Sequence, residues 1–168
     1  MEQSKKQVYF FDESRFGTHS KIGHAWFKKG SRTRIPYKLG FKSFYLYTAA
    51  SDTGEDYTLI IDAVNKECMQ IFLDEFSKTL TNDIIFIMDN APWHKSLKAP
   101  SNIEIVYLPS YSPELNPVER LWKYLKDHTL KNKVYENLEN LESAVSSFIK
   151  AITKEEIASI CSCDYIRL

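Results

Sequence analysis

The chain has 168 residues, of which 43% are hydrophobic and 14% aromatic, and its 22 basic and 22 acidic residues give a formal net charge of zero. This length and composition predict one globular domain with a sizeable core and exclude a disordered protein. No apolar run approaches the roughly 18 residues of a membrane span, and the first six residues lack the apolar stretch of a signal peptide. We therefore expect a cytoplasmic protein. The cysteines are too few and too unevenly spaced for a disulfide framework or a zinc site; they are Cys68, Cys161 and Cys163.

Charge is unevenly distributed along the chain. Residues 14–51 hold eight basic residues and no acid, whereas residues 52–89 hold nine acids and two lysines. A basic segment of this kind either faces a polyanion or is an ordinary solvated surface, and its composition favours neither. The basic residues are Arg15, Lys21, Lys28, Lys29, Arg32, Arg34, Lys38 and Lys42.

The first half of the chain is rich in predicted strands. Turn signals at Lys29-Gly-Ser31 and Ser51-Asp-Thr-Gly54 separate short apolar or aromatic runs. The first run is compact and aromatic, as is typical of a buried strand. The predicted strands cover residues 7–11, 24–29, 32–36, 44–50 and 57–63.

The second half alternates helices with strands. Asn65 is the predicted N-cap of an amphipathic helix. Residues 84–88 and 103–108 are continuous apolar runs of strand length, and the first is expected to be a central strand buried on both faces. This order predicts an α/β domain with a mixed sheet covered by helices. The later helices are predicted at residues 116–129, at residues 138–148, and after a capping box at Thr153-Lys-Glu-Glu156.

Three carboxylates lie at the ends of predicted core elements. Asp12 follows the first strand, Asp89 follows the strand at residues 84–88, and Glu119 opens a helix. Functional groups of α/β sheets gather at strand C-termini, so we expect the strands of Asp12 and Asp89 to be neighbours. Carboxylates brought together from distant points supply the oxygen ligands of two-magnesium phosphoryl-transfer sites. The sequence therefore predicts an enzyme that cuts or joins nucleic-acid strands.

Each acid also has a structural interpretation. Asp12 can be an exposed strand-end residue, and Asp89 can form an Asx turn. Glu119 is the third residue of a helix that starts at Asn116-Pro117, so its side chain can instead reach back to the helix cap. Glu13 points to the other face of an extended chain and ranks below Asp12 as a metal ligand.

These motifs resemble the catalytic domain of DDE/D transposases of the mariner-type superfamily, in its bacterial insertion-sequence branch. The resemblance spans most of residues 8–125. It implies an RNase H-like fold with a mixed five-stranded central sheet flanked by helices, and one catalytic domain over residues 1–168. The matching pieces are Phe11-Asp-Glu-Ser14, Gly23-His-Ala-Trp26 with Lys29-Gly30, Asp89-Asn-Ala91 with His94, Pro109-Ser-Tyr-Ser-Pro-Glu-Leu-Asn-Pro-Val-Glu119, and Leu121-Trp122.

The resemblance also implies an activity and its site. The catalytic and metal-binding triad falls on Asp12, Asp89 and Glu119, with two Mg²⁺ ions expected and Mn²⁺ as a substitute. The expected reaction is DNA cleavage and strand transfer at insertion-sequence ends, so the expected partners are double-stranded DNA and a second copy of the chain. Candidate DNA contacts are Lys28, Lys29, Arg32, Arg34, Asn90 and His94.

Two departures from the family pattern leave alternatives open. Only 29 residues separate Asp89 from Glu119, which is fewer than usual, and residues 95–102 are expected to have lost a helix. The usual N-terminal helix-turn-helix region is absent from the 168 residues, so an upstream DNA-binding half is an expected partner. One alternative is a plain RNase H-like nuclease without strand transfer. Another is a catalytically inactive domain that serves as a DNA-binding or oligomerisation module.

Overall fold

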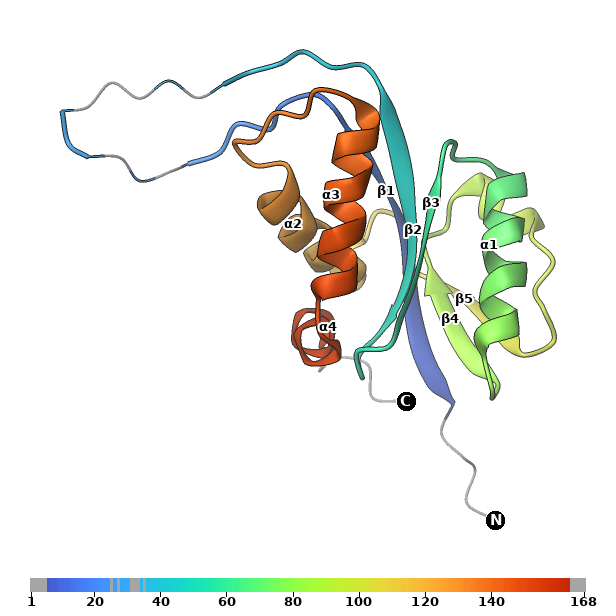
Figure 1. The fold of residues 1–168 in the computed structure, drawn as a ribbon. Helices are drawn as coiled ribbons and strands as arrows, with labels where there is room; N and C mark the ends of the chain where they lie inside the picture. The colour runs from blue at the N-terminus through green and yellow to red at the C-terminus, as the bar shows by residue number, and fades with distance from the viewer. Residues whose placement is uncertain (1–5, 25, 27, 31–33, 35, 164–168) are drawn as a thin grey trace.

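The structure, a computed structural model, describes residues 6–24, 26, 28–30, 34 and 36–163. Strands dominate the first part of the chain and helices the last part, as the colouring of Figure 1 shows. The elements are β1 (Gln7–Gly17), β2 (Ser43–Ser51), β3 (Asp56–Ile61), α1 (Lys66–Thr79), β4 (Ile84–Met88), the 3-10 helix η1 (Pro92–Ser96), β5 (Ile103–Tyr107), the 3-10 helix η2 (Pro113–Leu115), α2 (Val118–Thr129), α3 (Leu138–Ala151) and α4 (Lys154–Cys161).

The strands form one mixed five-stranded sheet in the order β3-β2-β1-β4-β5. Strand β2 is antiparallel to β1 and β3, whereas β4 is parallel to β1 and β5. The predicted mixed sheet is confirmed, and so is the prediction that the strands of Asp12 and Asp89 are neighbours.

Strand β1 is longer than the sequence predicts. It covers Gln7–Gly17 instead of residues 7–11, so Asp12 lies inside the strand and not after its end. Pairing with β4 stops at Phe10, while pairing with β2 continues to the end of the strand. The second half of the strand is mostly polar, with Phe16 as its buried apolar residue, so its composition resembles that of a turn. Asp12 is therefore held by β2 on one side and faces the space beyond the end of β4 on the other.

Residues 18–42, here called the arm, do not form the two predicted strands. The described residues of ranges 24–29 and 32–36 are not in strands, and the rest of these ranges lies outside the described residues. Two backbone hydrogen bonds of 3.0 Å close the base of the arm, from Thr18 to Lys42 and from Ser20 to Lys38. Lys21 and Gly23 still hydrogen-bond to Asn132, after α2, and the described residues beyond Gly23 extend away from the body of the domain (Figure 1). An isolated hairpin without an apolar face to bury is marginal in water, which explains the difference from the prediction.

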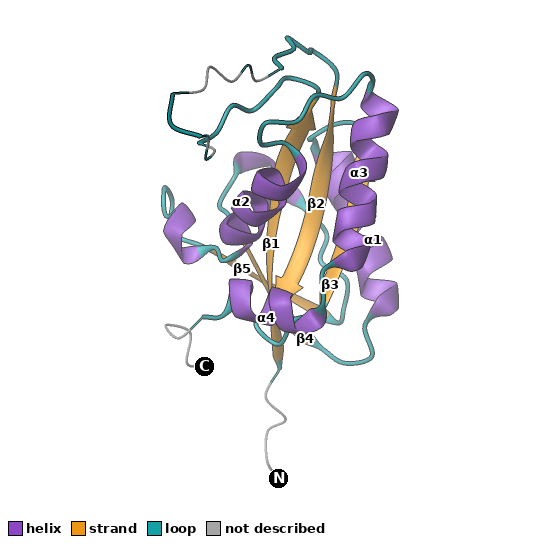
Figure 2. Cartoon of the chain, turned by 60° about the vertical axis from the view of Figure 1, so that its left-hand side comes forward, coloured by secondary structure: helices purple, strands orange, loops and turns teal. Residues whose placement is uncertain are grey.

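Helices cover both faces of the sheet, with α1 on one face and α2, α3 and α4 on the other (Figures 1 and 2). Phe11 packs with Phe72 of α1, whereas Phe10 packs in the cluster that contains Trp122 of α2. Successive strand residues point to opposite faces, so Asp12 belongs to the α2 face and Glu13 to the α1 face. Burial of each such aromatic ring contributes roughly 1.5–3 kcal/mol, which makes both faces rigid supports for the acids between them.

The predicted helix starts are largely confirmed. The Asn65 side chain accepts a 2.8 Å hydrogen bond from the Cys68 amide, and the capping box of α4 at Thr153 and Glu156 is complete. Helix α2 begins at Val118 instead of residue 116. None of the helices in the described part of the chain is long and apolar enough to cross a membrane.

Candidate metal-binding active site

The three predicted acids line one cavity of about 460 Å³ at the edge of the sheet. Asp12 comes from β1, Asp89 follows β4, and Glu119 lies in the first turn of α2. The remaining walls are the segments that follow β4 and β5, residues 89–92 and 108–113. The parallel pairing of β1 with β4, and the start of α2 beside them, bring the three acids to one cavity although β1 continues beyond Asp12.

Asp12 is fixed by a tryptophan from the helix that carries Glu119. The Trp122 indole nitrogen donates a 2.8 Å hydrogen bond to Asp12 Oδ2. Burial, followed by the nearby charges of Glu119 and Glu13, raises the pKa of Asp12 to about 7. The carboxylates of Glu119 and Glu13 thus disfavour a charged Asp12, and a bound cation would relieve that repulsion. Trp122, which the sequence analysis named only as part of the Leu121-Trp122 match, is both a core residue and a hydrogen-bond partner of Asp12.

Asp89 is held through one of its two carboxylate oxygens. Oδ1 lies 2.7 Å from Nδ1 of His94 and accepts a 3.2 Å hydrogen bond from the Ala91 amide. The hydrogen bond with His94 lowers the pKa of Asp89 despite partial burial. The hydrogen bond from the Ala91 amide is the predicted Asx-type interaction, so the structural interpretation of Asp89 is confirmed, and it does not exclude metal binding by the same side chain. The side chain remains 58% exposed, which leaves room for a ligand.

His94 is buried in η1, with 1% of its side chain exposed. Its Nε2 atom lies 3.6 Å from Oε1 of Glu13. Burial opposes a charged imidazole, but the carboxylates of Asp89 and Glu13 outweigh it and raise the pKa of His94 to about 9. This burial does not favour the predicted contact of His94 with DNA. The pairing with Glu13 was missed, although the alternation of strand residues already placed Glu13 on the face opposite Asp12.

Glu119 is exposed at the start of α2, and Asn116 fixes this start against β1. The Asn116 amide donates a 2.9 Å hydrogen bond to the Phe11 carbonyl, and its oxygen accepts one of 3.2 Å from the Val118 amide. The Asn116 side chain thus supplies the hydrogen bond at the start of α2, and among the described residues the Glu119 carboxylate makes no hydrogen bond back to this start, so it does not act as the predicted cap. It faces the cavity instead.

The donor set fits a hard divalent cation such as Mg²⁺, because three carboxylates border one cavity. Within the described residues, no three acidic, histidine or cysteine side chains are gathered closely enough to hold a metal ion as they stand. The acids therefore surround a space without closing on it.

The cavity rim contains a residue that the sequence did not single out. Tyr111 has a φ of 60°, a backbone region that is sparsely populated by residues other than glycine, and its side chain is fully exposed. Strained, exposed residues cluster at functional sites.

In the segment predicted to have lost a helix, residues 97–102 form no helix, and the short η1 precedes them.

The predicted DNA contacts fall in two places. Asn90 lines the cavity, whereas Lys28, Lys29 and Arg34 are exposed on the arm. Arg32 lies outside the described residues. None of the described arm residues lines the cavity.

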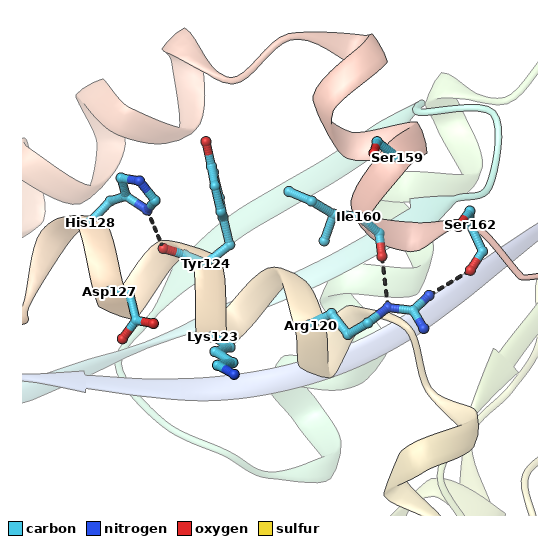
Figure 3. Close-up of a pocket in the computed structure, with 8 residues that line it drawn as sticks. All are labelled: Arg120, Lys123, Tyr124, Asp127, His128, Ser159, Ile160 and Ser162. Carbon is cyan, nitrogen blue, oxygen red and sulfur yellow. Dashed lines mark hydrogen bonds between the residues drawn. The ribbon is translucent and has the colours of Figure 1, made fainter.

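A second cavity, of about 500 Å³, lies between α2 and α4 and is lined by none of the three acids (Figure 3). Arg120 donates hydrogen bonds of 2.7 and 2.6 Å to the carbonyls of Ile160 and Ser162 at the end of α4. This arginine binds the helix end through its carbonyls, which identifies a structural role in joining α4 to α2.

The model of the family described as DDE superfamily endonuclease matches residues 7–142, which include all three acids. The chain belongs to this family. Its sequence relatives include an uncharacterised protein, y4pE/y4sA, of Sinorhizobium fredii, which is 34% identical over 92 residues, covering 52% of this chain and 68% of that protein. The uncharacterised 39 kDa protein of insertion element IS630 from Shigella sonnei is 28% identical over 87% of this chain and 45% of its own length. The Tcb2 transposase of Caenorhabditis briggsae is 27% identical over 71% of this chain and 50% of its own length.

Solved structures confirm the fold of this DDE endonuclease domain. The Mos1 transposase paired-end complex with the left transposon end superposes with a TM-score of 0.72 at 20% identity, covering 95% of this chain and 52% of that chain. The Mos1 catalytic domain gives a TM-score of 0.63 at 18% identity, covering 92% of this chain and 75% of that one. A retroviral intasome chain also superposes, with a TM-score of 0.53, 14% identity, and coverage of 97% of this chain and 57% of that one. The predicted RNase H-like fold is therefore confirmed. The chain spans about half the length of the IS630 and Tcb2 relatives.

Proposed function

We propose that this chain is the catalytic domain of a transposase that cleaves DNA and transfers strands at insertion-sequence ends. The observation that carries the proposal is the convergence of Asp12, Asp89 and Glu119 on one cavity from three different elements. The family match includes all three acids, and similar proteins carry the names transposase and insertion element.

The proposed cofactor is a pair of Mg²⁺ ions, for which Mn²⁺ substitutes, held by the three carboxylates. Bound ions of this kind activate an attacking oxygen and stabilise the leaving one in phosphodiester chemistry. Structures of Mos1 paired-end complexes with Mn and with Mg are among the similar folds.

The residues of the chain itself hold the acids in position. Trp122 holds Asp12, and Asn116 fixes the first turn of α2, so two acids are oriented before DNA arrives. The proposed reaction is attack by water on a phosphodiester to release a 3′-hydroxyl, followed by attack of that hydroxyl on target DNA. Each step exchanges one phosphorus–oxygen bond for another, so preorganised position and charge account for most of the expected rate.

The first test is cleavage and strand transfer on DNA that carries the element's own ends, with Mg²⁺ or Mn²⁺. The wild-type chain, the chain joined to its upstream reading frame, and Glu119→Gln in both forms are compared. We expect Glu119→Gln to lower the rate at least about 100-fold, since it removes a charged ligand while retaining the side chain's shape. Glu114→Gln is the matched control, because Glu114 is exposed in η2, a few residues before Glu119, and does not line the cavity.

Three outcomes separate the candidates. Full activity of Glu119→Gln would contradict the triad. Cleavage without transfer of a pre-cut end would favour a plain nuclease. Folded but inactive protein in every form would favour a DNA-binding or oligomerisation module.

The arm is the proposed contact with DNA phosphates. Lys28, Lys29 and Arg34 are exposed on it, and the 14–51 segment that contains it holds no acid. Neutralising Lys28, Lys29, Arg32 and Arg34 together should reduce the slope of log K against log salt by roughly 3–4, because each neutralised phosphate contributes about 0.9 to that slope. Fluorescence anisotropy with duplex DNA at several salt concentrations measures this slope, and an unchanged slope would contradict the assignment.

Two partners are also proposed. Paired-end and strand-transfer complexes of Mos1 are among the similar structures, which supports a homodimer as the active form. The coverage of about half of the longer relatives supports an upstream DNA-binding half. Light scattering of the joined form with and without DNA ends tests the dimer directly.

A further inference from the structure

We propose that His94 and Glu13 are positioning residues that orient the Asp89 carboxylate for metal binding. The inference rests on the proposed function, because it assigns roles around the same acids. Neither residue borders the cavity, so neither is proposed as a ligand.

The geometry at Asp89 is asymmetric. Two donors, His94 Nδ1 at 2.7 Å and the Ala91 amide at 3.2 Å, converge on Oδ1. Among the described residues, Oδ2 accepts no hydrogen bond, and the side chain is 58% exposed beside the cavity. Without these donors an exposed carboxylate samples several rotamers. With them, one oxygen is held and the other is left for a cation.

His94 is itself fixed from several sides. Its ring meets the edge of Phe11 at 6.3 Å between centroids, and Tyr107 donates a 2.9 Å hydrogen bond to the His94 carbonyl. Its side chain is almost fully buried, so the Nδ1 atom that faces Asp89 has little freedom.

Glu13 lies near the second ring nitrogen of His94, Nε2. His94 Nε2 is buried without a hydrogen-bond partner in the described structure, and the Glu13 carboxylate lies 3.6 Å away with 14% of its side chain exposed. A histidine kept only for packing would not direct a buried nitrogen at a nearly buried acid, since both groups lose solvation. Glu13 therefore favours an imidazole whose Nε2 carries a proton, and it helps to hold the ring in place.

The experiment measures Mn²⁺ binding by the full chain, from the electron paramagnetic resonance signal of free Mn²⁺. Wild type is compared with His94→Leu, His94→Asn and His94→Gln. The Asn amide reaches the position of Nδ1, whereas the Gln amide reaches that of Nε2. Asp89→Asn removes the ligand and serves as the site control, and thermal unfolding checks that each variant is folded.

We expect His94→Leu and His94→Gln to weaken Mn²⁺ binding about 10- to 100-fold, the usual effect of losing an outer-shell partner. His94→Asn should stay within about threefold of wild type, and Glu13→Gln should fall between the two. A merely structural histidine would not separate Asn from Gln in this way. If His94→Leu does not fold, the Asn and Gln pair decides.

Two results would overturn the inference for different reasons. Wild-type affinity in His94→Gln and His94→Leu, with binding lost in Asp89→Asn, would reject the positioning role and leave the proposed metal site intact. Failure of wild type to bind Mn²⁺, or no loss in Asp89→Asn, would reject the metal site and the positioning role together.

Discussion

The cavity and the arm both contain large aromatic side chains, but these are buried beside the cavity and exposed on the arm. At the cavity, Trp122 is 2% exposed and its indole nitrogen is used to hold Asp12. On the arm, Trp26 is 102% exposed and Phe41 88% exposed. The acids therefore depend on the packing of the domain, whereas the arm, beyond a base that is bonded to the domain through Lys21 and Lys38, exposes large aromatic side chains. The comparison shows that this fold positions the acids in its packed body and carries its exposed aromatic surface on a separate segment, the arm.

The two tryptophans give the largest expected contrast. Trp122→Ala should lower the free energy of unfolding by about 3–5 kcal/mol, since it empties a filled core position and leaves Asp12 without its donor. Trp26→Ala should change it by no more than about 0.5 kcal/mol, as is usual for an exposed site. Urea unfolding of both variants measures the difference. Similar losses in the two variants would show that the arm is part of the folded core.

Two glycines with a positive φ, Gly54 in the body of the domain and Gly30 in the arm, allow the same comparison for the backbone. Gly54, in the turn between β2 and β3, has a φ of 90°, and an added Cβ would overlap the Lys154 carbonyl oxygen at the start of α4. Gly30 in the arm has a φ of 83°, with nothing within 4 Å of an added Cβ.

We expect Gly54→Ala to cost about 2–4 kcal/mol, the sum of the left-handed backbone cost and an overlap. Gly30→Ala bears only the first cost, about 1 kcal/mol, and serves as the matched control. Chemical denaturation of both variants checks the ranking, and a larger loss for Gly30→Ala would reverse our view of the arm.

The smallest effect concerns acid pH. The hydrogen bond from Lys154, with those from Thr53 and Ser51, lowers the pKa of Glu55 from 4.5 to about 2. A depressed carboxyl pKa favours the folded state above the unfolded value. This contribution is therefore present above about pH 4.5 and is lost as the pH falls towards 2.

The melting temperature of wild type should fall over that range more than that of Glu55→Gln, by a small margin because the pair is largely solvated. The arm has no acid to add to this effect. Parallel pH profiles for the two proteins would contradict the assignment.

Much of the fold was readable because its signals are local. Each of these signals is contained in a few neighbouring residues, and each prediction is confirmed: the caps at Asn65 and Thr153 and the strand at residues 84–88. The places of two acids in the fold were also predictable, since Asp89 follows a strand and Glu119 opens a helix. The second half of β1 was not, because its polar residues are stabilised by β2 and α2, which lie far away in the chain.

The partners of the acids were harder to predict for the same reason. The bonds from Trp122 to Asp12 and from Asn116 to Phe11 join residues more than 100 positions apart. No periodicity within a window reports such contacts. The pairing of His94 with Glu13 likewise requires knowing that η1 packs on the α1 face of the sheet, which only the tertiary structure provides.

The hydrogen bond from Asn116 to the Phe11 carbonyl has a mechanical consequence. Strand β1 loses its partner β4 after Phe10, and the side-chain amide of Asn116, just before α2, then donates to the next carbonyl of β1, that of Phe11. The start of α2 is thereby fastened to the backbone beside Asp12, while the far end of the same strand runs directly into the arm. Together with the hydrogen bond from Trp122 to Asp12, the Asn116 bond ties β1 to α2 at two points, so we expect a displacement of the strand at Asp12 to carry Glu119 with it.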